Sequence, residues 1–364
     1  MARRSPSCWL VCIDYNLSTR DKMTQEEFSD RYNIKYLTET KGLELMKNNK
    51  RRLGKSDLTL SRIGLGAWAI GGEWEWGWGS QDDQKSIKTI HKALEARINW
   101  IDTAAIYGLG RSERVVGEAL KQTSYKPYIF TKCGLVWDEN RKVGNALHRE
   151  SVLNEIEASL KRLDVETIDL YQIHWPNPDG DIEEAYEVMA EIQKTGKIRY
   201  LGVSNFSVEQ MQRVGKIAEI TSLQPPYSLL FPEVEQEILP YCLEQEIGVI
   251  NYSPMASGLL SGKMDRERIK NLPDDDWRKR NDNYKEPRLT RNLALVEILI
   301  EIGKRHGSTA GEAAIAWTLL NPAVTSAIVG MRSPDQVDGV IHAGEIILTE
   351  QDIQEIETFL SKEK

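Results

Sequence analysis

The fold is decided by a stretch that reads YIFTKC over Tyr128–Cys133, ESVLNEIEASLKRL over Glu150–Leu163 and IDLYQIHW over Ile168–Trp175. The first and third segments are short and rich in β-branched and aromatic residues, which is typical of strands. In the middle segment an apolar residue recurs at helical spacing from Leu153 to Leu163, so this face is expected to pack on the core. The charged residues between them, Glu155 and Arg162 included, are expected to face solvent. A strand, a helix and another strand predict a parallel βαβ unit.

The same alternation repeats about eight times after Arg51. The other predicted strands are Arg62–Trp68, Ile98–Thr103, Ile198–Asn205, Ser222–Tyr227, Gly248–Pro254 and Thr325–Gly330. Eight parallel strands in this order favour an α/β fold of the (β/α)8 TIM-barrel type. A doubly wound sheet is disfavoured because the fingerprint G-x-G-x-x-G is missing, and Gly64-Leu65-Gly66 lacks the third glycine.

Two regions are expected along the chain, an N-terminal extension of residues 1–50 and a barrel domain of residues 51–364. The extension has no sustained period of 2 or 3.6, so no packed element is assigned to it. A disordered tail, an overlong gene start with Met23 or Met46 as the true start, and a weak targeting peptide all remain open.

Three segments of the barrel domain stand outside the regular alternation. Arg52–Ser61 reads as a hairpin that closes the bottom of the barrel. Gly71–Gln81 and Ala256–Arg288 are long polar connections, interpreted as lids or binding loops over the C-terminal face, with a plain surface insertion as the alternative.

Composition excludes several classes of function. The net charge of -8 argues against a nucleic-acid partner, which needs a concentrated basic surface. The apolar run Cys8–Ile13 is too short to span a bilayer or to direct secretion. The four cysteines have neither disulfide-framework spacing nor metal-site spacing with the five histidines. We therefore expect a cytoplasmic protein with reduced thiols, without a metal or a membrane partner.

Polar residues end almost every predicted strand, namely Asp102, Lys132, His174, Ser204, Asn205, Gln224 and Ser253, and Arg332 follows the last strand. The carboxyl ends of barrel strands meet on one face, where active sites of this fold lie. Asp102 and Lys132 come from neighbouring strands and should form an ion pair, because a buried charge is costly without a partner. Tyr107, five residues after Asp102, places a phenol beside this pair.

This combination indicates acid catalysis. A neighbouring ammonium favours the phenolate, so Lys132 is expected to lower the pKa of Tyr107 from about 10 toward neutrality. Such a phenol acts as a general acid, while His174 holds a carbonyl oxygen against it and Asp102 keeps Lys132 charged. Each residue alone has an ordinary structural explanation, and the four together favour a site.

With Asp102, Tyr107, Lys132 and His174 in this order, the chain from Arg51 onward resembles the aldo-keto reductase family. Further blocks carry the resemblance: Ile101–Ala104 with Tyr107 and Gly108, Tyr171–Trp175, Gly202–Phe206, Gln224–Ser228 and Tyr252–Pro254. The run from Gly64 to Gly72 looks most like the bacterial general-stress type. The resemblance implies NADPH-dependent reduction of aldehydes or ketones to alcohols, with these four residues as the catalytic tetrad.

The resemblance also implies a set of cofactor-binding residues. Ser204, Asn205 and Gln224 would hydrogen-bond the nicotinamide carboxamide, Tyr227 would stack on its ring, and Trp68 would line the space above it. The residues resembling the family's pyrophosphate-binding loop are Ser253, Met255, Gly258, Leu260 and Lys263.

The run Gly330–Gln336 resembles the adenosine-binding end of the family. Arg332 and Ser333 would contact the 2′-phosphate, which favours NADPH over NADH because guanidinium matches phosphate geometry. Val340 stands where the family commonly has Asn, so the adenine contacts are expected to differ.

Six tryptophans near the catalytic face imply an aromatic substrate pocket, with packing of the barrel rim as the alternative: Trp68, Trp74, Trp76, Trp78, Trp137 and Trp175. The expected partner is a small carbonyl compound. A second reading is an NADPH-binding regulatory module like the channel β-subunits, which resemble aldo-keto reductases; the N-terminal segment is the feature that supports it. A barrel with non-redox chemistry would require phosphate and metal signals that are missing from the sequence.

Overall fold

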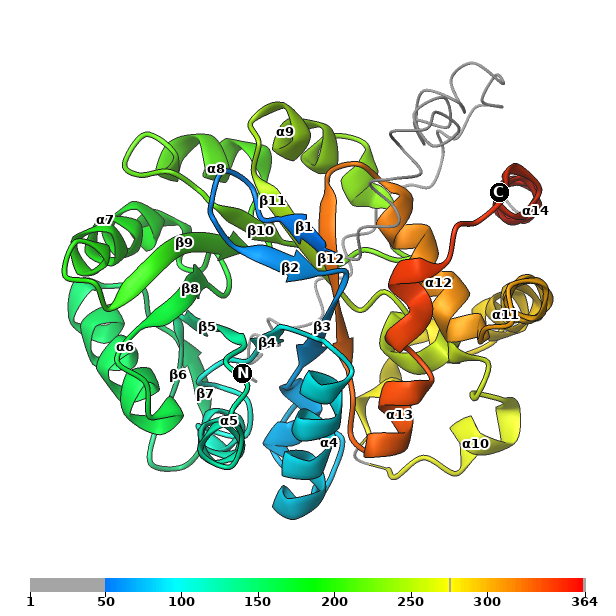
Figure 1. The fold of residues 1–364 in the computed structure, drawn as a ribbon, viewed down its shortest axis with the longest axis horizontal. Coiled ribbons are helices and arrows are strands. Elements are labelled where there is room, and N and C mark those ends of the chain that lie inside the picture. Colours follow the sequence, from blue (N-terminus) through cyan, green and yellow to red (C-terminus); the bar gives the residue numbers. More distant parts are fainter. Residues whose placement is uncertain (1–49, 275, 363–364) are drawn as a thin grey trace, which may run out of the picture.

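The structure, a computed structural model, describes residues 50–274 and 276–362. Apart from Lys50, the predicted N-terminal extension lies outside the described residues. Eight parallel strands close into a barrel in chain order (Figure 1): β3 Ile63–Gly66, β4 Trp100–Asp102, β5 Tyr128–Cys133, β8 Ile168–Ile173, β9 Ile198–Ser204, β10 Ser222–Gln224, β11 Gly248–Tyr252 and β12 Val324–Gly330. The predicted barrel and its eight strands are confirmed, and several strands end earlier than predicted.

Helices surround the barrel (Figure 1): α4 Asp83–Glu95, α5 Arg111–Lys121, α6 Arg149–Leu163, α7 Ile182–Gln193, α8 Val208–Val214, α9 Ile238–Glu244, α11 Arg288–Arg305, α12 Ala310–Leu320 and α14 Glu350–Ser361. Short helices α10 (Arg266–Lys270) and α13 (Pro334–Asp338) lie in the loops. Side chains cap several of these helices. In α12 the Thr309 hydroxyl accepts from the Glu312 amide and the Glu312 carboxylate accepts from the Thr309 amide.

Helix α6 begins one residue before the predicted Glu150, and its buried face agrees with the prediction at Ile156, Leu160 and Leu163 but not at Leu153. Val152 is fully buried and Leu153 is 38% exposed, so the prediction for Leu153 is wrong. Two charged residues expected in solvent are also drawn inward. Glu155 accepts hydrogen bonds from the Gly134 amide, and Arg162 pairs with buried Glu113 at 2.6 Å. Because a stripe that begins at residue 152 has the same helical spacing, periodicity alone does not fix which face is buried.

The predicted hairpin closes the bottom of the barrel. Strands β1 (Lys50–Arg52) and β2 (Thr59–Ser61) pair antiparallel and lie across the barrel in Figure 1. Leu53, Leu58 and Leu60 are fully buried and pack on large side chains from inside the barrel, Trp100 and Phe130 among them. The lower interior is therefore filled by apolar side chains, and the polar strand ends lie above it.

The long loops meet one another over the C-terminal face. The connection after β3 begins with a 3-10 helix at Trp68–Gly71, and the one after β11 contains α10 and the 3-10 helix Trp277–Arg280. The rings of Trp68 and Trp277 lie 6.2 Å apart, and Arg278 lies 4.6 Å above the ring of Trp78. These contacts between segments far apart in sequence disagree with a plain surface insertion.

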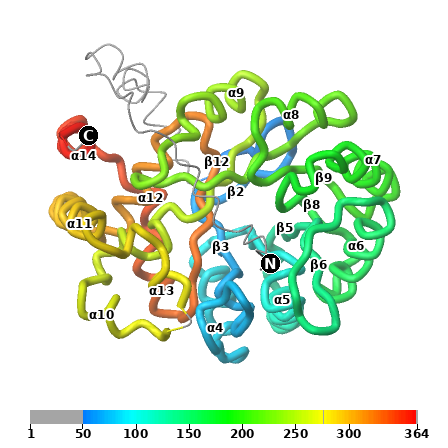
Figure 2. The backbone as a smooth tube through the Cα atoms, turned by 180° about the vertical axis from the view of Figure 1, so that it is seen from behind, coloured from blue at the N-terminus to red at the C-terminus, as the bar shows by residue number. Residues whose placement is uncertain are grey.

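A small hairpin that the sequence did not predict follows β5. Its strands are β6 (Leu135–Trp137) and β7 (Val143–Asn145), paired antiparallel. Figure 2, which shows the side opposite to Figure 1, places β6 beside α6 and places α10 on the other side of the barrel, near α13.

Candidate active site

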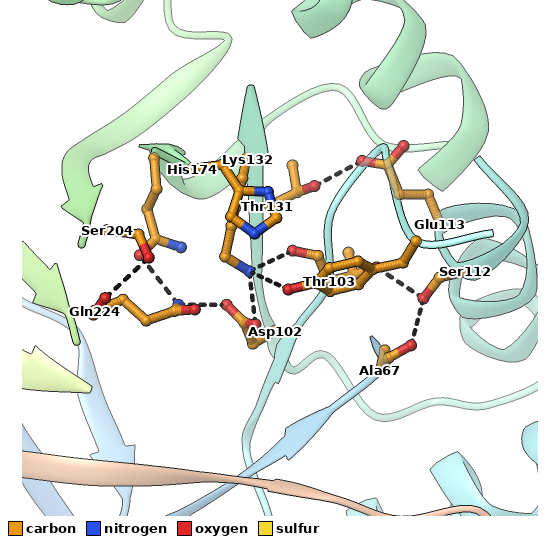
Figure 3. A network of polar contacts seen from close by, with 12 residues as sticks. Ala67, Asp102, Thr103, Ser112, Glu113, Thr131, Lys132, His174, Ser204 and Gln224 are labelled. Carbon is orange, nitrogen blue, oxygen red and sulfur yellow. Dashed lines mark hydrogen bonds and ion pairs between the residues drawn. The ribbon is translucent and has the colours of Figure 1, made fainter. Parts of the chain in front are cut away.

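The polar ends of β4, β5 and β10 meet in one hydrogen-bonded group (Figure 3). Lys132 Nζ donates to Asp102 Oδ2 at 2.7 Å and to the Thr103 carbonyl oxygen at 2.8 Å. Gln224 Nε2 donates to the other Asp102 oxygen at 2.8 Å. Asp102 and Lys132 are only 3% and 1% exposed, so each buried charge has its partner and further hydrogen bonds. The predicted ion pair is confirmed.

Tyr107 lies against this pair. Its Oη is 3.3 Å from Lys132 Nζ, within hydrogen-bond distance. The ring centroids of Tyr107 and His174 lie 5.7 Å apart at an interplanar angle of 76°. The structure therefore brings together all four side chains that the sequence singled out, on one face of the barrel.

Short-range contacts hold the loop that carries Tyr107 after β4. The Ser112 hydroxyl donates to the Ala67 carbonyl at 2.8 Å and lies 2.9 Å from the Thr103 hydroxyl (Figure 3). The Ser112 amide donates to the Tyr107 carbonyl at 3.1 Å. The start of α5 is thus tied to the ends of β3 and β4, which fixes the backbone beside the phenol.

The Lys132 side of the site is supported from behind β5. Thr131 Oγ1 donates to Glu113 Oε1 at 2.6 Å (Figure 3). Arg162 pairs with the same carboxylate. Glu113 is fully buried. This contact joins α5 and α6 to the strand that carries Lys132, so the ammonium is held by the packing of three elements.

The expected pKa of Tyr107 is wrong in direction. Burial raises its pKa well above the ordinary value of 10, and the charges of Asp102 and Tyr252 raise it further. The phenolate loses more from burial than it gains from Lys132, whose charge is already engaged by Asp102. Tyr107 therefore keeps its proton at neutral pH.

His174 is also uncharged at neutral pH. Burial lowers its pKa well below 6.5, and the positive charge of Lys132 lowers it further. A neutral imidazole has one N–H donor and one acceptor nitrogen. The face between Tyr107 and His174 thus offers two hydrogen-bond donors to a single oxygen atom, one of them a transferable phenol proton.

Three predicted nicotinamide contacts lie together at the ends of β9 and β10. Asn205, at a left-handed φ of 63°, donates from Nδ2 to the His174 carbonyl at 3.1 Å and to Ser204 Oγ at 3.0 Å. Ser204 Oγ donates to the Gln224 carbonyl at 2.9 Å. These amide and hydroxyl groups adjoin Asp102 through Gln224.

Tyr227 does not join this group. It is 1% exposed, its ring packs on Trp317 of α12 with centroids 5.2 Å apart, and its Oη donates to Glu235. Tyr227 lies three residues after β10 ends at Gln224, and its contacts with Trp317 and Glu235 show that its side chain is directed toward the helices. The expected stacking of Tyr227 on a nicotinamide does not fit this position.

Tyr252 is the aromatic residue that sequence reasoning missed. It ends β11, its Oη donates to Asn205 Oδ1 at 2.9 Å, and it lies close enough to Tyr107 to raise the pKa of that phenol. The signal present in the sequence was the position of Tyr252 near the end of the predicted strand Gly248–Pro254.

The residues expected to bind pyrophosphate follow β11 in one turn-rich segment. Ser253 and Gly258 have positive φ values of 56° and 95°, Met255 is half-buried, and Leu260 is fully buried, so only its backbone is available to a ligand. Lys263 is exposed, and its ammonium lies 3.9 Å from the place that a Cβ on Gly339 would take. This segment therefore adjoins the expected adenosine end.

At the adenosine end, Gly330 is exposed and Arg332 is half-buried. The Arg332 guanidinium donates to Gln81 Oε1 at 3.0 Å and to the Ser80 carbonyl at 2.9 Å, and its amide donates to Gln336 Oε1 at 2.6 Å. Burial lowers the pKa of Arg332, and so does the nearby positive charge of Arg278.

An apolar wall stands beside the phenol. Trp74, Trp137 and Trp175 pack, together with Tyr107, around the buried cluster of Ala104, Ile106 and Leu135. The Trp74 and Tyr107 centroids are 6.3 Å apart. Trp68 instead packs edge-on against Trp78, with centroids 5.4 Å apart.

Within residues 50–274 and 276–362, no helix is both long and apolar enough to cross a membrane. In the same part of the chain, no three His, Cys, Asp or Glu residues are grouped so as to hold a metal ion.

Comparisons with known proteins agree with this geometry. A model of the Aldo/keto reductase family matches residues 62–361. The chain is 39% identical over 311 residues to aldo-keto reductase YhdN of Bacillus subtilis (strain 168), covering 85% of this chain and 92% of that protein. It is 35% identical over 315 residues to the NADH-specific methylglyoxal reductase of Escherichia coli (strain K12), covering 82% and 94%. Among solved structures, the glycerol dehydrogenase AKR11B4 from Gluconobacter oxydans matches with a TM-score of 0.80 and 38% identity, covering 86% and 95%.

Proposed function

This chain belongs to the aldo/keto reductase family, and we propose that it reduces aldehydes or ketones to alcohols with NADPH, with Tyr107 as the proton donor. Family membership implies nicotinamide-dependent reduction of small carbonyl compounds. The observation that carries the assignment of Tyr107 is the 3.3 Å distance between its Oη and Lys132 Nζ, with Asp102 held on the same ammonium.

The tetrad residues have distinct roles in this proposal. The bound cofactor supplies a hydride to the carbonyl carbon. As the carbonyl oxygen gains negative charge, Tyr107 Oη gives its proton to that oxygen, and His174 donates a hydrogen bond to the same atom. The Lys132 ammonium stabilises the phenolate left behind, and Asp102 keeps that ammonium in place. The pKa of Tyr107, raised by burial, suits this order of steps, because the phenol keeps its proton until a strongly basic oxygen forms beside it.

The groups beside the tetrad are suited to a nicotinamide. Asn205, Ser204 and Gln224 present amide and hydroxyl groups at the ends of β9 and β10, next to His174 at the end of β8, and a carboxamide needs such partners. Tyr252, and not Tyr227, is the aromatic residue that would face the nicotinamide ring, since it is bonded to Asn205.

NADPH is proposed over NADH because of the two neighbouring guanidinium groups of Arg332 and Arg278. Guanidinium binds phosphate through paired, charge-assisted hydrogen bonds, and a 2′-phosphate offers several negatively charged oxygens for them where a ribose hydroxyl offers one uncharged oxygen. Arg278 pairs with Asp276 at 2.6 Å, and Arg332 is held by the loop at Ser80 and Gln81. Lys263, at the same end, adds a third positive charge.

We also place the protein in the cytoplasm. In the described part of the chain, Cys133 and Cys242 are free and buried, which suits a reducing compartment.

The test is steady-state loss of NADPH absorbance with 4-nitrobenzaldehyde or methylglyoxal, for wild type and Tyr107→Phe. Turnover that falls by at least about a hundredfold in the variant, with NADPH affinity retained, supports the proposal. Tight NADPH binding without turnover in the wild type would instead indicate a regulatory module.

A further inference from the structure

A cleft lies beside the loop that carries Tyr107. It has a volume of about 390 Å³, and three arginines line it: Arg111 and Arg114 from the first turn of α5, and Arg141 from the tip of the β6–β7 hairpin. We call it the arginine cleft. Part of its wall is backbone, since Gly71 and Gly108 also line it and a Cβ on Gly71 would lie 2.7 Å from the Gly108 amide nitrogen.

The arginine cleft shares two loops with the tetrad. Gly108 lines the cleft, and Tyr107, the residue before it, lies against Lys132. On the other loop, Glu73 lines the cleft, and Trp74, the next residue, packs beside the Tyr107 ring. On each loop, one residue lines the arginine cleft and its neighbour in sequence lies at the tetrad. The cleft is therefore next to the phenol of Tyr107.

Among residues 50–274 and 276–362, two of the three arginines have no carboxylate partner. Arg111 pairs with Asp83 at 2.6 Å and is locked by a further bond to the Gln81 carbonyl. Arg114 and Arg141 are exposed, and within the described residues neither has an ion pair; Arg141 donates only to the Glu73 backbone carbonyl, at 3.3 Å.

The charge of the arginine cleft is opposite to that of the whole chain. The three guanidinium groups outnumber the two carboxylates beside them, those of Glu73 and Asp83. The cleft therefore carries a net positive charge, although the whole chain has a net charge of -8. A positively lined hollow concentrates small anions even on an acidic protein. Guanidinium groups presented without carboxylate partners suit a carboxylate or a phosphate, which accept two hydrogen bonds from one guanidinium.

We propose that the arginine cleft binds a carboxylate or phosphate group on the carbonyl substrate, so that the enzyme prefers anionic aldehydes or ketones to neutral ones. This inference rests on the proposed function. The carbonyl end lies at Tyr107 and His174, the carbon chain passes the apolar side of Trp74, and the charged end reaches Arg114 and Arg141. Ser80 and Gln81, which also line the cleft, are polar and suit a hydrated oxyanion.

The test compares matched aldehydes in the wild type and in the double variant Arg114→Gln/Arg141→Gln. The first pair is 4-carboxybenzaldehyde and 4-nitrobenzaldehyde, and the second is glyceraldehyde 3-phosphate and glyceraldehyde, so that carboxylate and phosphate are distinguished. Arg52→Gln is the control, because Arg52 is exposed on the hairpin at the opposite end of the barrel.

In the wild type we expect a higher kcat/KM for the anionic member of at least one pair. In the double variant that preference should fall about tenfold through KM, with the neutral aldehydes unchanged. In 0.5 M KCl the wild type should lose much of the preference, because salt screens exposed charges. The Arg52→Gln control should behave as wild type.

The inference would be overturned if the wild type and the double variant showed the same preference for the anionic aldehydes while turning over the neutral ones. The proposed function would then still stand. Turnover of none of the four aldehydes would overturn the proposed function, and the inference with it.

Discussion

Lys132 Nζ lies 2.7 Å from Asp102 Oδ2 and 3.3 Å from Tyr107 Oη, so one ammonium group serves a carboxylate and a phenol. The carboxylate takes the shorter contact. That order explains why the phenol keeps its proton: Lys132 is largely neutralised, and burial decides the pKa of Tyr107. In the proposed reaction, Lys132 would act on the tyrosine mainly after proton transfer, when the phenolate carries a negative charge.

The pH dependence of reduction follows from these groups. Tyr107 must be protonated to act as the acid, and its raised pKa keeps it protonated to above pH 10. His174, with its lowered pKa, stays neutral above pH 6.5. Burial lowers the pKa of Lys132 from 10.5, so we expect kcat for reduction, when chemistry limits the rate, to be constant from pH 6.5 up to the pH at which Lys132 loses its charge. A fall in kcat through pH 7 to 8 that disappears in Tyr107→Phe would contradict the raised pKa.

Removing the counter-charge should destabilise the fold. In Asp102→Asn the buried Lys132 ammonium loses its carboxylate, and we expect the free energy of unfolding in urea to fall by about 3–5 kcal/mol. The double variant Asp102→Asn/Lys132→Met, which removes both charges, should regain part of that loss. A single variant as stable as wild type would show that the pair does not hold a buried charge.

Substitutions of Tyr252 and Tyr227 should have different effects on cofactor binding and on stability. Tyr252→Phe removes the hydrogen bond to Asn205 and is expected to raise the Kd for NADPH about three- to tenfold, measured by cofactor fluorescence. Tyr227→Phe removes the bond to Glu235 and should lower stability by about 1 kcal/mol with the Kd unchanged. The reverse pattern would restore Tyr227 to the site.

Arg332→Ala tests the choice of cofactor. If its guanidinium binds the 2′-phosphate, kcat/KM with NADPH should fall at least about tenfold and kcat/KM with NADH less than about twofold. Parallel measurements with both cofactors check this. An equal loss with both would mean that Arg332 acts only through its bonds to Ser80 and Gln81.

Glu155 gives the fold a pH-dependent stability. Burial raises its pKa to about 7, from an ordinary 4.5. Between pH 4.5 and 7 the folded chain therefore binds more protons than the unfolded chain, and this group's contribution to stability falls by up to about 3 kcal/mol as the pH rises. Glu155→Gln should remove that dependence, whereas Glu157→Gln, at an exposed residue of the same helix, should keep it. Urea unfolding at pH 5 and pH 8 measures the difference.

The sequence predicts the barrel and the tetrad because both depend on local pattern. Strand patterns and the polar residues that end them can be recognised within short stretches such as Ile168–Trp175. The fold then brings those strand ends to one face of the barrel. The pKa of Tyr107 could not be read in the same way, since it depends on burial by elements far apart in sequence.

Two other errors have a common geometric origin. Leu153 and Val152 both fit a helical stripe, and only packing against the barrel decides which is buried. Tyr252 is the last residue of β11 and lies on the same side of that strand as Ile250 of the barrel interior, whereas Tyr227 lies three residues beyond the end of β10, where strand alternation no longer sets its direction. The β6–β7 hairpin has no strong periodicity and was missed for that reason.

The three leucines under the barrel also limit the routes by which Tyr107 would regain a proton. Leu53, Leu58 and Leu60 fill the lower end with hydrocarbon, which offers no relay for hydrogen ions. In the proposed reaction, the phenolate of Tyr107 would therefore be reprotonated from bulk water through the C-terminal opening of the barrel, the side on which the alcohol would also leave. Reprotonation and product release would then share a single route to solvent.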